Sequence, residues 1–296
     1  MERIKGYSAI FIMYLVAFTV AWLTYYALPE WSMIAKILIA DIAATFTIYL
    51  FSVLFNNASI YDPYWSVAPM VIVLFFAQTM NVGTLLMILV IMFWGVRLTV
   101  NWAITFKGMH HEDWRYRYFK TRFPRLWPLI NLFGIHLMPT IVVYVALIPA
   151  ILYVRAGGPI SLVTLLGTFV AISATLIQWS ADRTLHGFKR EERKMSVCKN
   201  GLWKYSRHPN YFGEILMWSG VFVMMLGALP EFYISVIGPL LMITLFSTIS
   251  IPLMEKRQLE RKPDYEHYVE TTHALIPLPF SKKQTPMEDS DKSFQE

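Results

Sequence analysis

The stretch YSAIFIMYLVAFTVAWLTYYAL, from Tyr7 to Leu28, is 22 residues long and carries no charged side chain. A helix needs about 20 predominantly apolar residues to cross the hydrocarbon core of a bilayer. The stretch follows Arg3 and Lys5, exceeds the apolar core of a typical signal peptide, and is followed by no evident small-residue cleavage site. We therefore predict a retained membrane-spanning helix at the start of the chain.

The rest of the chain has the same character. Of its 296 residues 56% are apolar and 16% are charged, whereas soluble proteins are about 45–50% apolar and about 25% charged. We predict an all-α, multi-span integral membrane helix bundle of seven to eight transmembrane helices, with cytoplasmic loops forming a cofactor site. The candidate spans are Tyr7 to Leu28, Met33 to Phe55, Trp65 to Met80, Val82 to Ala103, Phe133 to Val154, Ile160 to Ala181, Gly213 to Leu229 and Phe232 to Met254. The third and seventh are short, so seven spans is the alternative.

The positive charges indicate an orientation. With eight spans and a cytoplasmic N-terminus, 23 of the 26 Lys and Arg residues fall in cytoplasmic segments, as the positive-inside rule requires. We therefore predict that both termini and the cofactor site lie in the cytoplasm, and we predict no nucleic-acid partner. Cys198 is the only cysteine, which excludes an intrachain disulfide and a cysteine metal cluster. Adjacent histidines such as His110 and His111 diverge on a helix, so we predict no metal site.

The segment KNGLWKYSRHPNYFGE, from Lys199 to Glu214, concentrates unusual chemistry beside a predicted span. The planar guanidinium of Arg207 suits a phosphate or a carboxylate, and the amide of Asn210 can both donate and accept. Glu214 lies at the mouth of a span, where a charge is a functional-site hypothesis by default. The alternative is an interfacial anchor of Arg, Tyr and Trp with a proline turn.

Upstream, QWSADRTLHGFK ends the sixth candidate span. Gln178 and Asp182 are four residues apart and share one helix face, so an amide and a carboxylate are presented together. Asp182 could hold a ribose hydroxyl and Lys189 a phosphate. The alternative is a cluster of polar residues that stops membrane transfer.

Two further strings place polar groups within or between spans. In WGVRLTVNWA, Arg97 lies inside an apolar run with Asn101 one turn later, and a buried arginine must meet an anion or a set of acceptors. In NNASIYDPYWS, Tyr61, Asp62 and Tyr64 place proton donors at a helix junction. A carboxyl group in an apolar site can stay protonated and act as a general acid, although a plain interfacial turn is equally consistent with this string.

The strings WSADRTLHGFK, GLWKYSRHPNYFGE and IPLMEKRQLERKPDYEHYVETTHALIP resemble, in this order and spacing, the steroid 5-alpha-reductase superfamily. The resemblance is to its bacterial branch, the domain-of-unknown-function 1295 proteins, and extends more distantly to sterol reductases. It implies a location in the bacterial inner membrane. It divides the chain into N-terminal transmembrane helices (residues 1–55), a membrane reductase domain (56–280) and a polar disordered tail (281–296).

The resemblance implies an NADPH-dependent oxidoreductase that reduces an activated carbon–carbon double bond, an enone, of a steroid-like or other lipophilic substrate entering from the bilayer. With the residues reasoned above, the predicted cofactor-binding set is Arg97, Asn101, Gln178, Asp182, Lys189, Arg207, Asn210, Tyr211, Glu214 and Arg257. The candidate catalytic residues are Tyr61, Asp62 and Tyr64. Where the steroid enzymes have a Gln-Glu pair this chain has Tyr61 and Asp62, and Trp94 stands in place of a proton-donating tyrosine.

A rival resemblance rests on RHPNYFG and on Tyr265 to Tyr268, which are similar to isoprenylcysteine carboxyl methyltransferases that use S-adenosylmethionine. Those relatives tend to have paired glutamates where this chain has Met254 and Glu255, and they lack the WSADRTLHGFK string. A dinucleotide has more groups to hold than S-adenosylmethionine, so Asp182 and Lys189 favour the reductase. The predicted partners are a lipophilic small molecule and membrane lipids.

Overall fold

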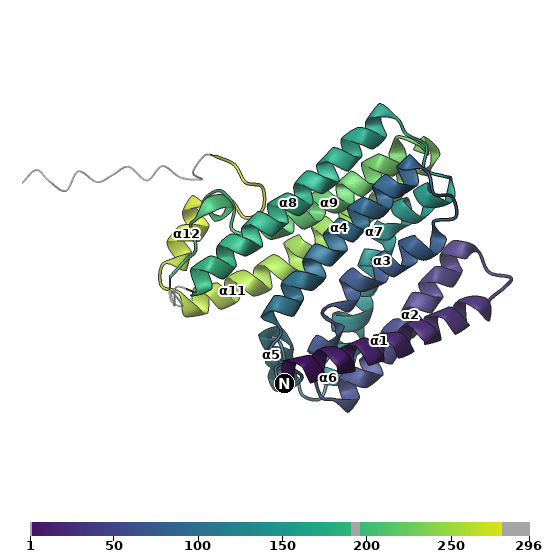
Figure 1. Cartoon of the computed structure of the whole chain (residues 1–296). Coiled ribbons are helices and arrows are strands. Elements are labelled where there is room, and N and C mark those ends of the chain that lie inside the picture. Colours follow the sequence, from purple (N-terminus) through teal and green to yellow (C-terminus); the bar gives the residue numbers. More distant parts are fainter. Residues whose placement is uncertain (1, 191–195, 280–296) are drawn as a thin grey trace, which may run out of the picture. The chain divides into compact units, whose positions relative to one another are not determined.

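The computed structural model describes residues 2–190 and 196–279, and every regular element in them is helical (Figure 1). This confirms the predicted all-α fold. The elements are α1 (Glu2–Tyr26), α2 (Met33–Leu54), η1 (Ala58–Tyr61), α3 (Tyr64–Phe76), α4 (Val82–Thr105), α5 (Trp114–Arg122), α6 (Trp127–Leu129), η2 (Ile130–Leu137), α7 (Met138–Arg155), α8 (Leu162–Arg190), η3 (Gly201–Lys204), α9 (Pro209–Leu226), η4 (Pro230–Val236), α10 (Ile237–Leu245), η5 (Phe246–Ser250), α11 (Ile251–Arg261) and α12 (Tyr265–Thr271). The predicted tail, residues 281–296, lies outside the described residues.

Seven helical segments in the described residues are long and apolar enough to cross a membrane, so the chain is an integral membrane protein. They are Glu2–Tyr26, Met33–Leu54, Ala58–Phe76, Val82–Thr105, Trp127–Arg155, Leu162–Arg190 and Pro230–Arg261. Seven of the eight candidate spans coincide with these segments. The eighth, Gly213 to Leu229, falls on α9, which is 18 residues long and is not among the seven. The orientation of the spans stays a prediction.

The chain forms two compact units. Unit 1 comprises Met1–Thr175 and Ile215–Leu245, and unit 2 comprises Leu176–Glu214 and Phe246–Glu296. The continuous helices α8 and α9 each contribute to both units.

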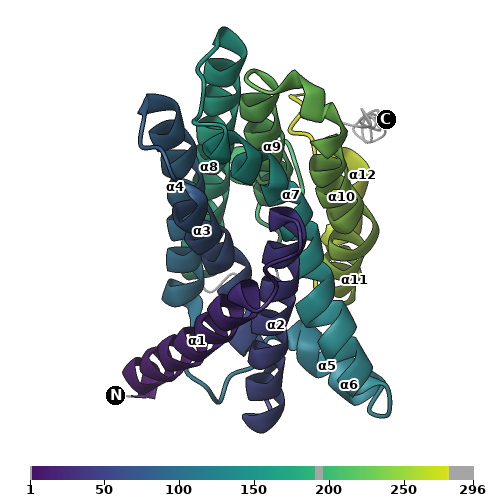
Figure 2. The same ribbon diagram turned by 90° about the vertical axis from the view of Figure 1, so that its right-hand side faces the viewer.

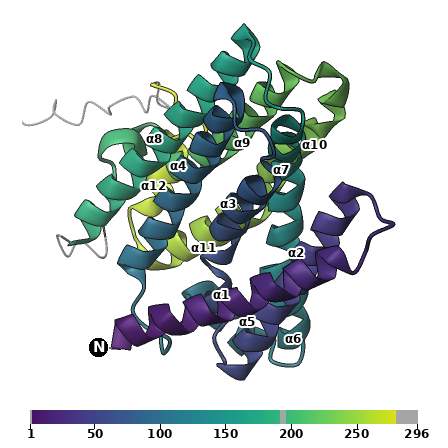
Figure 3. The ribbon, with the colours of Figure 1, turned by 45° about the vertical axis from the view of Figure 1, so that its right-hand side comes forward.

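In unit 1, α1 and α2 form a helical hairpin that packs against the following segment (Figure 3). Ser32 starts α2 by accepting a hydrogen bond from the backbone N–H of Ala35 at 3.3 Å, which satisfies one of the unpaired donors at a helix N-terminus. Tyr14 of α1 and Ile48 of α2 are buried in one cluster with Ile60 of η1. The hairpin therefore forms one wall of a core whose other wall comes from residues after α2.

That following segment, residues 57–61, is buried although it does not form an α-helix. The Tyr14 hydroxyl donates to the Ile60 carbonyl at 2.8 Å, and the Asn57 side chain accepts from the Ser59 N–H at 2.9 Å. Irregular backbone at membrane depth is tolerated where it is buried in protein, because lipid cannot satisfy its polar groups. This segment precedes α3, which explains why the third apolar run in the sequence is short.

Within unit 1, α8 and α9 lie side by side (Figure 2). A Cβ atom added to Gly220 of α9 would lie 2.7 Å from the backbone nitrogen and 2.9 Å from the Cβ of Ala171 of α8. Small residues let the backbones of membrane helices approach closely, which is a main source of helix association in lipid. Gly220 therefore sets the distance between these two helices.

Unit 2 combines the second half of α8 with residues 196–214, α11 and α12. Ala181, Phe188, Cys198 and Trp203 form its small core, and the Trp203 indole N–H donates to the Ala181 carbonyl at 2.9 Å. The Tyr268 hydroxyl of α12 donates to the carbonyls of Trp203 and Ser206. These contacts join segments that are more than 60 residues apart and hold the RHPNYFG string against the rest of the unit.

Candidate functional site

The RHPNYFG string begins in unit 2 with a backbone pairing that fixes its position. The Arg207 N–H donates to the His273 carbonyl at 2.9 Å, and the Ser206 hydroxyl donates to the Leu275 carbonyl at 2.7 Å. Ser206 Oγ also accepts from the His208 N–H at 3.1 Å. The string therefore leads into α9 from a defined anchor.

The Arg207 side chain is committed to contacts inside unit 2. It is only 5% exposed, and its Nε donates to Glu255 Oε1 of α11 at 2.7 Å. Its Nη1 donates to the carbonyls of Val269, at 3.0 Å, and Thr272. The guanidinium thus satisfies carbonyls at the C-terminal end of α12. We infer that Arg207 positions the loop that follows it.

His208 shares the same carboxylate and begins an aromatic stack. Its Nε2 lies 3.1 Å from Glu255 Oε1, and its ring stacks on Tyr211 with centroids 5.3 Å apart and an interplanar angle of 3°. Tyr211 stacks in turn on Phe246 at 4.7 Å. The predicted cofactor residue Tyr211 is therefore held between two rings, and its orientation is set by packing.

The two predicted cofactor strings meet at Asp182 and Asn210. The Asn210 amide Nδ2 donates to Asp182 Oδ1 at 3.4 Å, although the residues are 28 positions apart in sequence. The Asn210 Oδ1 accepts from the Tyr211 N–H at 3.1 Å. Both side chains are half-buried. A carboxylate and an amide therefore lie together at a surface that water or a ligand can reach.

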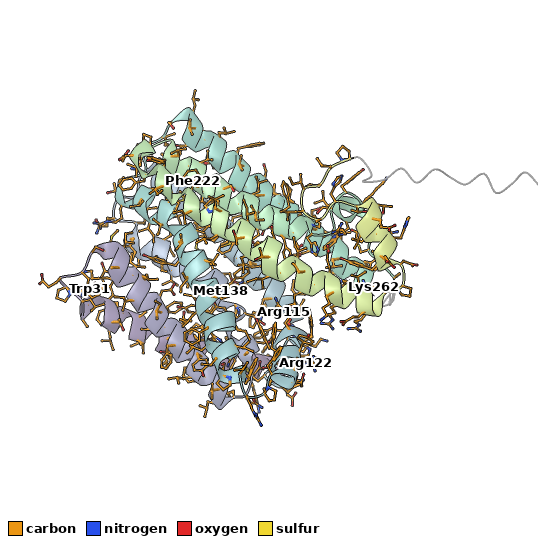
Figure 4. The ribbon with its side chains drawn as sticks, turned by 180° about the vertical axis from the view of Figure 1, so that it is seen from behind. Trp31, Arg115, Arg122, Met138, Phe222 and Lys262 are labelled. Carbon is orange, nitrogen blue, oxygen red and sulfur yellow. The ribbon has the colours of Figure 1, made fainter. Side chains whose placement is uncertain are left out.

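Positive charges gather beside this pair. The Lys189 ammonium of α8 lies within the electrostatic reach of Asp182, of Arg257 on α11 and of Lys262. Figure 4 labels Lys262, the residue that follows α11. Burial lowers the pKa of Lys262, and the nearby charge of Lys189 lowers it further. We call Lys189, Arg257 and Lys262 the cationic cluster. Mutually repelling cations are stabilised by an anion placed among them.

The other predicted cofactor residues lie in both units. Gln178 of α8 and Glu214 of α9 belong to unit 2 and are buried, at 0% and 4% exposure. Arg97 and Asn101 belong to α4 in unit 1 and are half-buried. The structure therefore brings the predicted cofactor residues of α8, α9 and α11 into unit 2 and leaves Arg97 and Asn101 in unit 1.

The candidate catalytic residues, all in unit 1, separate into two environments. Tyr61 is buried, and its hydroxyl lies 2.8 Å from Thr140 Oγ1, which in turn lies 3.0 Å from Thr45 Oγ1. The buried Tyr64 hydroxyl donates to Asp41 Oδ1 at 2.7 Å. The Tyr61 and Tyr64 rings are 5.7 Å apart. These two phenols therefore belong to one hydroxyl-rich region among α2, α3 and α7.

Asp62 belongs to the other environment. It accepts a hydrogen bond from the Tyr116 hydroxyl of α5 at 2.5 Å, and the guanidinium of Arg115, labelled in Figure 4, acts on it electrostatically. Burial raises the pKa of Tyr116 well above its ordinary value, and the charge of Asp62 raises it further. Asp62 thus ties the η1 segment to α5.

Trp94, which stands in place of a proton-donating tyrosine, is fully buried. Its ring packs against Trp218 with centroids 4.9 Å apart, so it fills the core of unit 1.

Sequence reasoning missed Lys262 of the cationic cluster and two buried polar residues of unit 1, Asp41 and His136. Asp41 was detectable, because it is a lone carboxylate inside the apolar run of α2, and intramembrane charge marks a candidate functional residue. His136 in the π-helical element η2 donates from Nδ1 to the Asn131 carbonyl at 2.8 Å. Its buried Nε2 has no hydrogen-bond partner within the described residues. No spacing in the sequence indicated this second position.

Comparisons with known proteins add a family. Residues 48–272 match the family described as "Protein of unknown function (DUF1295)". The chain is also 26% identical over 265 residues to the uncharacterized protein C594.04c of Schizosaccharomyces pombe, covering 76% of this chain and 74% of that protein. No solved structure matches the chain. The family match covers most of the sequence, including the RHPNYFG string and α11, and we conclude that this chain belongs to the DUF1295 family.

Proposed function

We propose that this membrane protein is an NADPH-dependent reductase that reduces the activated carbon–carbon double bond of a lipophilic enone. The observation that carries the proposal is the cationic cluster of Lys189, Arg257 and Lys262 beside the Asp182–Asn210 pair in unit 2. The cationic cluster favours an anionic ligand, and the Asp182–Asn210 pair supplies a carboxylate and an amide. A phosphorylated dinucleotide presents phosphates, ribose hydroxyls and a carboxamide, so its groups match both parts.

The residues of unit 2 have distinct roles in this proposal. Lys189 and Arg257 bind phosphate groups, and Asp182 accepts a hydrogen bond from a ribose hydroxyl. Asn210 pairs with the carboxamide or an adenine edge. Arg207 and Glu255 hold the loop from which Asn210 projects, because Arg207 binds Glu255 and the Val269 carbonyl within unit 2. When bound, NADPH supplies a hydride for the β-carbon of the double bond.

The proton donor is chosen among the three candidate catalytic residues, Tyr61, Asp62 and Tyr64. As hydride reaches the β-carbon, negative charge develops on the substrate oxygen, and a donor must stabilise it before the α-carbon is protonated. Tyr61 suits this role because its hydroxyl proton is not committed to another group. In its hydrogen bond with Thr140 either oxygen could be the donor. Tyr64 already donates to Asp41, and Asp62 accepts from Tyr116. We therefore favour Tyr61 among the three candidates.

Thermal unfolding of the purified full chain in detergent tests the cofactor assignment. NADPH, NADH and S-adenosylmethionine are compared over a concentration series, since a ligand at 100 times its Kd adds about 2.7 kcal/mol of stability. We expect a shift with NADPH, a smaller shift with NADH, which lacks the 2′-phosphate, and none with S-adenosylmethionine. A shift with S-adenosylmethionine alone would support the methyltransferase reading instead.

Two pairs of variants sharpen this test. Asn210→Ala and Lys189→Ala should weaken NADPH binding about tenfold or more, since each removes a hydrogen bond to a polar or charged group. The matched controls are Asn200→Ala and Lys204→Ala, because both residues are exposed in unit 2 outside the cluster. Equal NADPH affinity for all four variants, or no NADPH binding by the parent protein, would overturn the proposal.

A further inference from the structure

Unit 1 contains a cavity of about 250 Å³ enclosed by α1, α2 and α3. Its closed end is formed by Asp41, Tyr64 and Ala68, which are 7%, 1% and 4% exposed. Trp22 and Phe75, which also line it, are 54% and 49% exposed. In a membrane protein, exposed apolar side chains on spanning helices face lipid tails. The cavity therefore runs from a lipid-facing mouth to a buried end that carries a carboxyl group.

The polar end of this cavity consists of one hydrogen-bonded pair. The Tyr64 hydroxyl donates to Asp41 Oδ1 at 2.7 Å, so the phenol proton is already used. No Lys, Arg or His is among the residues that line the cavity in the described part of the chain. An ionised carboxylate in such surroundings is costly unless a partner compensates it. The pair thus favours a ligand whose head group completes its hydrogen bonds.

The chemistry of the pair restricts that head group. If Asp41 is ionised, the pair offers only acceptors, and the ligand must donate a hydrogen bond. If Asp41 is protonated, the pair offers one donor and one acceptor. A hydroxyl group satisfies both states because it donates and accepts, whereas a ketone satisfies only the second. A fatty acid anion would be repelled by the ionised carboxylate.

We propose that this cavity binds a lipophilic alcohol, with the hydroxyl on the Asp41–Tyr64 pair and the hydrocarbon tail leaving the cavity between Trp22 and Phe75. Ligand pockets are commonly about 300–1,000 Å³, so 250 Å³ accommodates the head and the first part of the chain. The remaining tail lies against the lipid-facing surface, where its apolar area costs nothing to expose.

The proposal goes beyond the proposed function. Two of the three helices that line the cavity, α1 and the first part of α2 with Asp41, precede the residues 48–272 that match the family, whereas α3 lies within them. The proposal also requires no nucleotide. A failure of this proposal would therefore leave the NADPH assignment unaffected, and the reverse also holds.

Photo-crosslinking of the full chain in phosphatidylcholine nanodiscs tests the proposal. The probe is 1-hexadecanol carrying a diazirine on its chain, and labelled peptides are located by mass spectrometry. We expect labels in the peptides that contain Trp22 and Phe75. Unlabelled 1-hexadecanol should compete about tenfold better than its methyl ether, which cannot donate a hydrogen bond, and better than hexadecanoic acid or hexadecylamine.

Two variants separately test the recognition of the head group and the location of the binding site. Asp41→Leu removes the carboxyl group and should abolish the preference for alcohol over ether, whereas Asp264→Leu, at an exposed position of unit 2, should preserve it. Ala68→Leu fills the closed end and should reduce labelling about tenfold while leaving the pair intact. Ala68→Leu and the alcohol–ether comparison remain informative if Asp41→Leu fails to fold.

Three results would overturn the proposal. Equal competition by alcohol and ether would show that the Asp41–Tyr64 pair does not select a hydroxyl group. Stronger competition by the amine or the acid would show that the pair recognises a charge. Labels confined to peptides outside α1, α2 and α3 would show that the cavity is not the binding site.

Discussion

Replacement of Glu255 by glutamine tests the contacts that hold the RHPNYFG loop in unit 2. Glu255 Oε1 accepts from Arg207 Nε at 2.7 Å and lies 3.1 Å from His208 Nε2. The Arg207 side chain is 5% exposed and the Glu255 side chain is 16% exposed, so water screens their interaction weakly. Glu255→Gln keeps the shape of the side chain but leaves the arginine charge buried without its counter-charge.

The expected loss is large. Removal of one partner from a buried ion pair costs about 3–5 kcal/mol, because the remaining charge is uncompensated. At about 2–4 °C of Tm per kcal/mol for a chain of this general size, Tm should fall by roughly 10 °C. The double variant Arg207→Met, Glu255→Leu should recover only part of the loss. Apolar replacement of a buried ion pair is often nearly neutral, but here the carbonyls of Val269 and Thr272 also lose their donor.

Size-exclusion chromatography after heating of the detergent-solubilised protein measures this Tm. Glu260→Gln is the matched control, because Glu260 is an exposed glutamate on the same helix, α11. The reasoning is refuted if Glu255→Gln and Glu260→Gln have the same Tm, or if the double variant is less stable than Glu255→Gln.

Three further variants test separate features by the same assay. Thr140→Val leaves the buried Tyr61 hydroxyl without its partner and should cost about 1–3 kcal/mol; an unchanged Tm would contradict the role of this bond. Gly220→Ala should lower the free energy of unfolding by about 1–3 kcal/mol, because the added Cβ would clash with α8. The control Gly187→Ala has no atom within 4 Å of the added Cβ and should be neutral or stabilising. Similar effects of the two substitutions would contradict the close packing of α8 and α9. Lys262→Ala should raise the Tm of the ligand-free protein by relieving repulsion and weaken NADPH binding; loss of stability without a change in NADPH affinity would argue against the cationic cluster.

The spans could be predicted because their signal is local. Each of the seven membrane-length segments corresponds to an apolar run in the sequence, and the requirement for about 20 apolar residues does not depend on tertiary contacts. The exception was the region around Ala58–Tyr61, where a short helical element extends α3 backwards through polar and aromatic residues. Its burial depends on Tyr14 and on the α1–α2 hairpin, which no local pattern reveals.

The candidate site was only partly accessible from sequence. The types of residues in the RHPNYFG string indicated polar recognition, but the partner of Arg207 is 48 positions away on α11. Arg207 was predicted to bind a ligand, whereas its side chain donates hydrogen bonds to Glu255, Val269 and Thr272 in unit 2. Similarly, Tyr64 was predicted as a proton donor without its acceptor, Asp41, which is 23 positions upstream on another helix. The role of a polar side chain depends on its partner in the fold. When that partner is far away in the sequence, no local pattern identifies it.

The buried segment at residues 57–61 also constrains how the protein is made. A ribosome delivers α1 and α2 before this segment, so the hairpin can already be in the bilayer when the Ile60 carbonyl enters it. Tyr14 then provides a hydrogen-bond donor for that carbonyl, which lipid cannot offer. A chain synthesised without α1 would leave the Ile60 carbonyl without the Tyr14 donor. The helix α1 therefore assists the insertion of the segment that follows α2, because it supplies a hydrogen bond that the surrounding lipid cannot.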